Sequence, residues 1–520
     1  MSRKVAVAVL AGFYPAIFFL SNNWHIFSIE QSLVLLVGTS LVSLAILLPI
    51  SYLLIYILKK IAGNKFPRVE SSDVRDLFFD ATLTVFALIF SVFLLRNTLA
   101  SIEIQTVLLY AIIAAILVCF SYISLKRGLK PVLYTLVILS SLSIVTLFIN
   151  LYTKTEVPIE YWTSKNKATY DQIKFRKTPN VYLIITESYP NKPALKAVYG
   201  IDNASFYKEM RNLGFKFNHD HFSNYNHTLS SLPSLFGMEH HYGIIHMVSF
   251  DSFGGRRMLE AKIYNPVIDI FRSNNYKIQY LHTVSGLIPN GADVDFYFPS
   301  RSFLHGLRVF LTKQDIIETA PSNRKGSEPI VSIQNQISST SQSKNSYFNF
   351  IYLHYPNHSP SRIKAKSEKI ISQKLGEFRD TYYQKIESAN QRLLKFMNFI
   401  IDKDPDSIVI LLGDHGSWGF RNKKDTQSRP ISNQLYTLDR FGVLAGIRGP
   451  DELSDLMENG TIKSHINLFR YVFAHLSDDP TILSTKAPDD SYDQPFLMAI
   501  KDGSILEDYI KVKLIKGKKP

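Results

Sequence analysis

Residues that could bind a metal follow three short apolar segments in the second half of the chain. They are Glu187 after residues 181–185, His354 and His358 after residues 348–353, and Asp414 with His415 after residues 408–412. Carboxylate oxygens and imidazole nitrogens are ligands that suit Zn²⁺ or Mn²⁺. Each residue alone could equally cap a helix or lie at the surface. The combination is what favours a metal site.

A candidate nucleophile lies in the hydroxyl-rich stretch at residues 223–234, which opens an apolar segment. Thr228 in this stretch could stand at a helix N-terminus, where free N–H groups favour an anion such as phosphate. A metal beside the hydroxyl would lower its pKa and make an alkoxide accessible. An N-cap is the alternative reading of the same residue.

Short apolar strands alternating with helical patterns must position these residues. The expected strands are residues 181–185, 278–281, 348–353, 408–412 and 442–445. Apolar residues spaced by three or four predict a helix over residues 382–400. This alternation predicts a mostly parallel sheet covered on both faces, with ligands beyond the carboxyl ends of its strands. Residues 320–346 are expected to form a mobile surface segment.

The first third of the chain is predicted to be a bundle of five transmembrane helices. The apolar stretches cover residues 5–20, 32–58, 77–95, 104–125 and 131–152. Most of them reach the ~20 residues that a helix needs to span a bilayer. Basic residues gather before the first stretch, between the second and third, and between the fourth and fifth. The positive-inside rule therefore places the N-terminus in the cytoplasm and the residues after 153 outside.

Composition excludes several other classes. The net charge of +14 suits an anionic membrane surface or a phosphate-bearing substrate, and no nucleic-acid motif accompanies it. Cys119 is the single cysteine and lies in an apolar stretch. Intramolecular disulfides, cysteine-rich zinc modules and a thiol nucleophile in the soluble part are therefore excluded.

The order Glu187, Thr228, His358, Asp414-His415 behind five spans resembles the alkaline phosphatase–sulfatase superfamily. It is most similar to the membrane-anchored branch, the lipoteichoic acid synthase-like and phosphoethanolamine transferase enzymes. The segments that carry the resemblance are residues 180–188, the Thr228 stretch, residues 357–360 and residues 412–416. Composition and apolar stretches predict a transmembrane domain (1–152), a polar and basic juxtamembrane connector (153–178) and a basic tail (511–520). The resemblance implies that the α/β domain between them (179–510) is sulfatase-like.

The resemblance also implies residue roles. Glu187, Asp414 and His415 match the metal ligands of the family, and Thr228 matches its nucleophile, which also contacts the metal. His358 matches a histidine that binds the substrate phosphate, and His354 could match a second one. His465 is the candidate for a histidine contributed late in the domain, although a packing role is open for it. The implied cofactor is a divalent metal, Zn²⁺ or Mn²⁺.

The implied activity is transfer of a phospholipid headgroup, phosphoethanolamine or phosphoglycerol, through a phospho-threonine. The acceptor would be a glycan or lipid of the cell envelope, lipopolysaccharide among them. The expected location is the bacterial inner membrane, with the catalytic domain on the periplasmic or extracellular side. Sulfate-ester hydrolysis is not expected, because Ser231-Leu-Pro-Ser-Leu lacks the arginine of the sulfatase Cys/Ser-x-Pro-x-Arg motif. A membrane-bound phosphodiesterase or phosphatase and a non-catalytic sulfatase-like envelope protein remain the alternatives.

Overall fold

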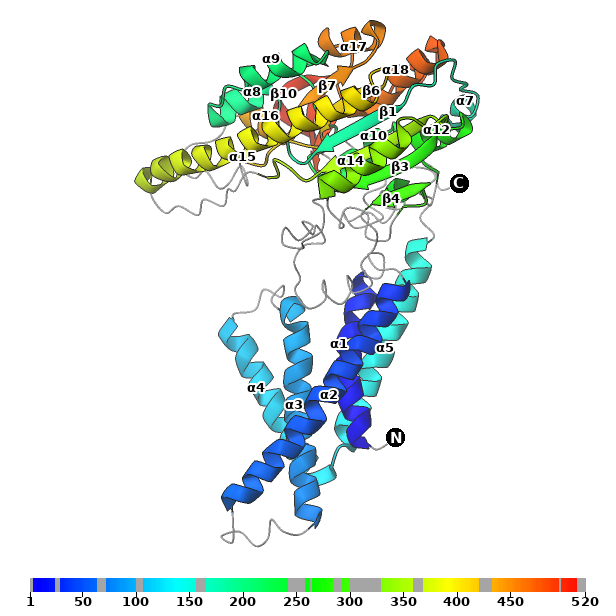
Figure 1. Cartoon of the computed structure of the whole chain (residues 1–520). Coiled ribbons are helices and arrows are strands. Elements are labelled where there is room, and N and C mark those ends of the chain that lie inside the picture. The colour runs from blue at the N-terminus through cyan, green and yellow to red at the C-terminus, as the bar shows by residue number, and fades with distance from the viewer. Residues whose placement is uncertain are drawn as a thin grey trace. The chain divides into compact units, whose positions relative to one another are not determined.

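The structure is a computed structural model of the whole chain, and it falls into two compact units. It describes residues 3–23, 29–62, 72–99, 106–155, 165–241, 258–261, 264–283, 292–298, 329–358, 368–419, 433–494 and 497–511. The N-terminal helices form the first unit, and the sheet with its covering helices belongs to the second (Figure 1). The basic tail predicted over residues 511–520 lies outside the described residues from 512 onward.

Five long helices make up the first unit. They are α1 (Arg3–Asn23), α2 (Ile29–Ala62), α3 (Ser72–Leu99), α4 (Thr106–Arg127) and α5 (Lys130–Thr155). Among the described residues, three stretches are long and apolar enough to cross a membrane: Arg3–Ser21, Ser32–Ile57 and Lys130–Asn150. The chain is thus a membrane protein with N-terminal spans, and helices also cover the other two predicted stretches wherever these are described.

A glycine lets α1 and α2 approach closely. A Cβ added at Gly12 would lie 2.3 Å from the backbone oxygen of Thr39, so no other residue fits without moving a helix. Beside it, the Ser43 hydroxyl donates to the backbone oxygen of Ala8 at 2.6 Å. Small residues and interhelical hydrogen bonds of this kind hold helices together in lipid, where the hydrophobic effect between helices is lost.

A seven-stranded sheet forms the centre of the second unit, in the order β2-β7-β6-β1-β5-β3-β4. The strands are β1 (Val181–Thr186), β2 (Lys216–Phe217), β3 (Lys277–His282), β4 (Phe296–Phe298), β5 (Tyr347–Leu353), β6 (Ile408–Gly413) and β7 (Ala445–Arg448). Strands β6, β1, β5, β3 and β4 are parallel, whereas β7 is antiparallel to β6 and β2 is antiparallel to β7. The sheet is therefore mostly parallel and mixed.

The predicted strands at residues 181–185, 278–281, 348–353 and 408–412 are confirmed within a residue or two. The one predicted at 442–445 was placed too early, because β7 begins at Ala445. Gly442 and Val443 make only isolated bridges, to Phe222 and Pro190. A four-residue apolar segment fixes neither the register nor the direction of its strand.

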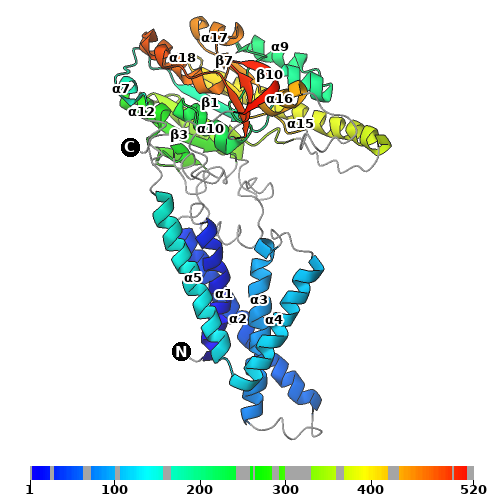
Figure 2. The same cartoon turned by 180° about the vertical axis from the view of Figure 1, so that it is seen from behind.

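Two hydrophobic cores lie on opposite faces of the sheet, because successive strand residues point to opposite sides. Val181, Leu183 and Ile185 belong to the first core, and Tyr182 and Ile184 belong to the second. Helices α10 (Thr228–Gly237), α12 (Pro266–Ser273), α17 (Asp451–Glu458) and α18 (His465–Ser477) cover the first face. Helices α9 (Ala204–Asn212), α14 (Pro329–Thr340) and α15 (Glu368–Lys403) cover the second, together with η4 (Leu195–Tyr199). Figure 2 shows the same layers from behind.

The smaller elements complete this unit. They are α7 (Lys167–Tyr170), α8 (Lys192–Ala194), α16 (Asn433–Phe441), η6 (Pro480–Thr485) and a three-stranded antiparallel sheet of β8 (Ser491–Gln494), β9 (Leu497–Lys501) and β10 (Ser504–Lys511). The prediction of a mobile surface segment over residues 320–346 is wrong for the part that the structure describes, which contains helix α14. Ile333 and Ile337 of α14 are fully buried, and residues 320–328 lie outside the described residues. A Ser- and Gln-rich composition concealed an apolar helical stripe.

A buried polar cluster joins the start of the second unit to helix α18. Arg470 is fully buried and donates to the hydroxyl of Tyr170 at 3.0 Å and to Glu239 Oε1 at 3.3 Å. Asn166 donates to the same carboxylate oxygen at 3.0 Å. Phe175 stacks on Phe473 at 5.6 Å. Residues 165–178, assigned to the connector from the sequence, thus pack against the body of the second unit.

Candidate functional site

Three strand ends bring the candidate ligands to one edge of the sheet. Thr186 at the end of β1 pairs in register with Leu353 of β5 and with Gly413 of β6. The residues that follow, Glu187, His354 and Asp414, therefore leave the sheet side by side. Glu187 and Asp414 are fully buried. The common edge that the sequence predicts thus follows from the register of three parallel strands.

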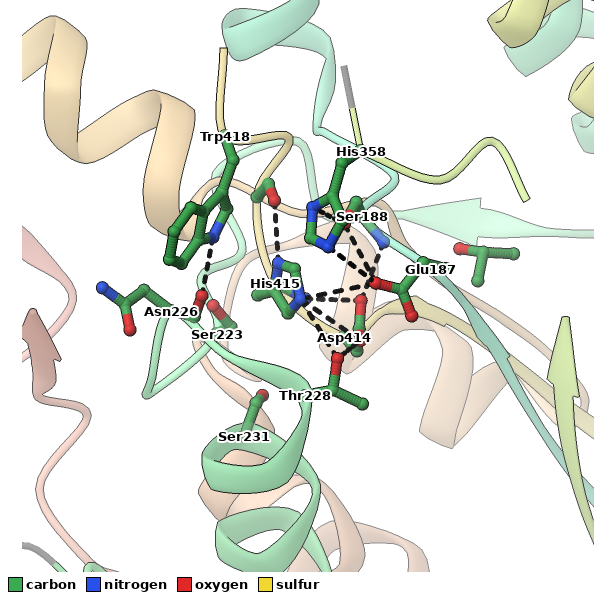
Figure 3. A network of polar contacts seen from close by, with 12 residues as sticks. Glu187, Ser188, Ser223, Asn226, Thr228, Ser231, His358, Asp414, His415 and Trp418 are labelled. Atoms are coloured by element: carbon green, nitrogen blue, oxygen red, sulfur yellow. Dashed lines mark hydrogen bonds and ion pairs between the residues drawn. The ribbon is translucent and has the colours of Figure 1, made fainter. Parts of the chain in front are cut away.

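Helix α10 contributes Thr228 at its first residue (Figure 3). The Thr228 hydroxyl donates to Asp414 Oδ2 at 2.7 Å and lies 3.2 Å from His415 Nε2. Thr228 is the first residue of the helix, a position where backbone N–H groups have no partner within the helix and an anion is favoured. The hydroxyl thus meets a carboxylate and an imidazole at a helix N-terminus.

A group of three side chains could hold a metal ion. One ligand atom from each of Glu187, His358 and His415 lies within 4.8 Å of the others. Glu187 Oε1 is 3.3 Å from His358 Nε2 and 3.7 Å from His415 Nε2. Figure 3 shows these three side chains converging with Asp414 above the start of α10. The sequence placed His358 with the substrate, so its position beside Glu187 adds a possible ligand.

Hydrogen bonds determine which imidazole nitrogens carry a proton. His415 Nδ1 lies 2.8 Å from the carbonyl oxygen of Gly416, which can only accept, so the proton is on Nδ1. The lone pair of His415 Nε2 then points to Thr228, Glu187 and Asp414. A backbone carbonyl that orients an imidazole in this way is the usual second partner of a metal-binding histidine.

His354 carries its proton on the same ring nitrogen as His415, but it turns that nitrogen toward the site. Asn357 Oδ1 accepts from the backbone N–H of His358 at 2.6 Å, so Asn357 Nδ2 is the atom that donates to His354 Nε2 at 2.8 Å. The proton of a neutral His354 is therefore on Nδ1, which faces Glu187 Oε2 at 4.0 Å. His354 offers the site a hydrogen-bond donor, which suits a substrate oxygen better than a metal ion.

Two buried carboxyl groups make a bound cation favourable at this site. Burial, and then the charge of Asp414, raise the pKa of Glu187 well above its usual range. Burial also raises the pKa of Asp414. Burial lowers the pKa values of His358 and His415 to about 3, so both imidazoles are neutral near pH 7. Two buried carboxylates without a cation are unfavourable, and a divalent ion would remove that cost.

The residues present therefore fit a divalent metal. Among the described residues, Glu187 Oε2 is buried and has no hydrogen-bond partner. His415 Nε2 lies within 3.7 Å of both Glu187 Oε1 and Asp414 Oδ2, so the lone pairs of these three atoms are close enough to share one ion. A set of carboxylate oxygens and imidazole nitrogens suits Zn²⁺ or Mn²⁺.

His465 lies at the first residue of α18 and is fully buried. Its Nδ1 is 3.1 Å from the hydroxyl of Ser231, one turn along α10 from Thr228. Burial lowers the pKa of His465 well below its usual value, so its ring is neutral. The structure thus places His465 against α10, and contact with substrate stays a prediction.

Sequence reasoning missed three residues that touch this site. Ser188 bonds to Glu187, His358 and Asp414, and the Tyr352 hydroxyl donates to Asp414 Oδ2 at 3.4 Å. The indole of Trp418 packs on the ring of His227 at 4.6 Å and donates to the backbone oxygen of Asn226. Ser188 and Trp418 lie within three residues of a predicted ligand, which was the available signal.

Gly416 should not tolerate a side chain. A Cβ there would lie 2.0 Å from the backbone oxygen of Asp439, so the loop that carries His415 must move. We expect Gly416→Ala to lower metal affinity by about 10- to 100-fold, because it displaces the carbonyl that orients His415. A Zn²⁺ titration of the purified protein measures this change.

Gly449→Ala is the matched control for that substitution, because its Cβ would meet only Ile408 at 3.4 Å, an ordinary contact. Equal zinc affinity in the two variants would contradict the role given to the Gly416 carbonyl.

The second unit matches a known protein family. The sequence profile of the sulfatase family matches residues 179–476. No curated protein matches the chain significantly. Similar solved structures include the integral membrane lipooligosaccharide phosphoethanolamine transferase A of Neisseria meningitidis, at 12% identity over 92% of this chain and 96% of that one, with a TM-score of 0.36.

Two further structures are similar at the same level. The lipoteichoic acid synthase LtaP of Listeria monocytogenes has 14% identity over 68% of this chain and 93% of that one, with a TM-score of 0.40. The zinc complex of the C-terminal periplasmic domain of EcEptC from Escherichia coli has 10% identity, over 65% and 95%, with a TM-score of 0.39. Values this low carry no statement about substrate.

Proposed function

The chain belongs to the sulfatase family, and on that premise we propose that it is a metal-dependent transferase of phospholipid headgroups. The transferred group is phosphoethanolamine or phosphoglycerol, and it passes through a phospho-threonine at Thr228 to a glycan or lipid of the cell envelope. The proposed location is the bacterial inner membrane, anchored by five spans, with the catalytic domain on the periplasmic or extracellular side.

One observation carries the proposal. The Thr228 hydroxyl stands at the start of α10 and donates to Asp414 Oδ2 at 2.7 Å, beside the buried Glu187, His358 and His415 group. An ordinary helix-capping threonine would accept from a backbone N–H of its own helix instead. A hydroxyl whose proton already points to a buried carboxylate is arranged to become a nucleophile.

The first step uses residues of this chain. Thr228 Oγ1 attacks the donor phosphorus, and Asp414 accepts the hydroxyl proton. The bond from phosphorus to the diacylglycerol oxygen breaks, and that oxygen takes up a proton from solvent. The N–H groups at the start of α10 and the Nδ1–H of His354 offer hydrogen bonds to the phosphoryl oxygens, whose negative charge grows in the transition state.

The second step releases the threonine. An acceptor hydroxyl attacks phosphorus, the bond to Thr228 Oγ1 breaks, and a neutral site histidine accepts the proton of the acceptor and passes it to solvent. The Thr228 oxygen takes back the proton that Asp414 accepted in the first step. We propose Glu187, Asp414, His415 and Thr228 as metal ligands, with His358 able to join them. A divalent metal bound there would lower the pKa of the attacking hydroxyl and offset the charge on the phosphoryl oxygens.

The membrane helices support a lipid donor. Three described stretches are apolar enough to span a bilayer, which keeps the site with an insoluble substrate. A soluble phosphate ester would need no such anchor. The net charge of +14 favours anionic lipid and glycan surfaces as partners.

Intact mass of the detergent-purified protein tests the proposal. After incubation with bacterial lipid extract and metal, wild type should carry a phosphoethanolamine or phosphoglycerol adduct, and Thr228→Ala should carry none. The mass of the adduct identifies the transferred group. Lipid turnover at the same rate with and without acceptor would instead indicate a hydrolase. Failure to bind any divalent metal would exclude the proposed chemistry.

A further inference from the structure

Ser188 has a backbone conformation that serine rarely adopts. Its φ is 56°, in the left-handed region, and the residue is fully buried directly after Glu187. Its N–H donates to Asp414 Oδ1 at 2.8 Å. Non-glycine residues are uncommon in this region, and the strain tends to be kept where a site needs it. Glycine would relieve the strain, so the side chain itself must contribute something.

The Ser188 hydroxyl connects two of the candidate ligands. Ser188 Oγ lies 2.9 Å from His358 Nδ1 and donates to Glu187 Oε1 at 3.4 Å. A serine hydroxyl has one proton to give. If that proton goes to the carboxylate, the hydroxyl must accept from His358, which places the imidazole proton on Nδ1. His358 Nε2 then faces Glu187 with a free lone pair, at 3.3 Å.

We propose that Ser188 is a positioning residue of the metal site, which rests on the metal binding of the proposed function but not on the transferred group. Its hydroxyl holds His358 in the tautomer that can bind a metal, as the Gly416 carbonyl does for His415. Its N–H turns Asp414 so that Oδ2 is left for Thr228. One strained residue thereby orients ligands from three strand ends.

The two roles of Ser188 can be separated by substitution. Ser188→Ala and Ser188→Gly both remove the hydroxyl and keep the N–H. Alanine keeps the backbone strain, whereas glycine relieves it. A residue that served the backbone alone would make Ser188→Gly equal or superior to wild type in every property. The proposed role instead predicts the same loss of metal affinity in both variants.

The experiment is a titration of the full-length, detergent-purified protein with Zn²⁺ against a chromophoric chelator, together with the unfolding midpoint of the chelated protein. We expect both variants to bind Zn²⁺ about 10- to 100-fold more weakly than wild type. We expect the chelated Ser188→Gly variant to unfold at a higher temperature than Ser188→Ala.

Ser407→Ala is the matched control. Ser407 is also a buried serine, but it lies before the opposite end of β6 and donates only to the carbonyl oxygen of Asp404. Its zinc affinity should equal that of wild type. Wild-type affinity in a folded Ser188→Gly variant would overturn the role of Ser188 and leave the proposed function standing. A wild type that binds no Zn²⁺ would overturn both.

Discussion

Replacing Thr228 by alanine is expected to lower headgroup transfer by about 10⁴-fold, because the variant loses the atom to which phosphorus is transferred. The hydroxyl donates to Asp414 and lies beside His415, so its loss removes the nucleophile while the other proposed ligands remain. Because Thr228 is also a proposed metal ligand, zinc affinity should fall as well, by about 10- to 100-fold, so rates are compared at saturating Zn²⁺. Rates with a fluorescent phospholipid donor and an envelope acceptor fraction measure the effect.

Two further variants are controls for the loss of activity in Thr228→Ala. Thr228→Ser keeps a hydroxyl and should retain a measurable rate and a covalent adduct. Ser234→Ala removes another buried hydroxyl of α10, one that donates only to the carbonyl oxygen of Ser231, and should be as active as wild type. Substantial transfer by a folded Thr228→Ala variant would mean that the acceptor attacks the lipid directly.

The second large effect is expected at Glu187, where activity and stability should change in opposite directions. Glu187→Gln should lower activity by more than about 10³-fold, because a neutral amide binds a divalent metal poorly and binds it without balancing its charge. In chelated protein the same change should raise stability by about 1–3 kcal/mol, because it removes a buried charge that has an unpartnered oxygen.

The stability difference between chelated Glu187→Gln and chelated wild type should depend on pH. The folded-state pKa of Glu187 is raised by burial and by Asp414, above an unfolded value of about 4.3. Its contribution to stability is then fully present below pH ~4.3 and is lost as pH rises through the folded-state pKa. The advantage of chelated Glu187→Gln over chelated wild type should therefore grow as the pH rises.

Added metal should reverse the order of stabilities. Wild type at a Zn²⁺ concentration of ~1,000 Kd should gain about 4 kcal/mol, and the variant should gain much less. Thermal unfolding in detergent, with and without chelator, measures both effects. A chelated Glu187→Gln variant that is less stable than wild type at pH 8 would show that Glu187 is not an uncompensated charge.

The strand ends could be predicted from the sequence because buried parallel strands are read as continuous apolar segments. Glu187, His354 and Asp414 each follow such a segment directly, so the edge of the sheet that carries them followed from fold class alone. The proposed nucleophile was harder to recognise from the sequence, because Thr228 has the ordinary pattern of a helix start. In the structure His227 is the N-cap, and Thr228 is the first helical residue, with its hydroxyl donating to Asp414.

Other features depend on side-chain geometry that no spacing reveals. His358 lies five residues beyond the end of β5, and the intervening loop brings it to Glu187. The position of the Ser188 side chain depends on a positive φ, which cannot be predicted from a serine in the sequence. Helix α14 buries only a few apolar residues among serines and glutamines, so its amphipathic stripe was too narrow to recognise.

The buried Arg470 cluster has a consequence for dividing the chain. A soluble fragment cut at residue 179, where the family match starts, would omit Asn166, Tyr170 and Phe175. Arg470 would keep Glu239, but it would lose a hydroxyl acceptor in a site that is fully buried. The same helix α18 begins at His465, whose ring lies beside Ser231 of α10. A soluble fragment that keeps this cluster intact should therefore begin near residue 165.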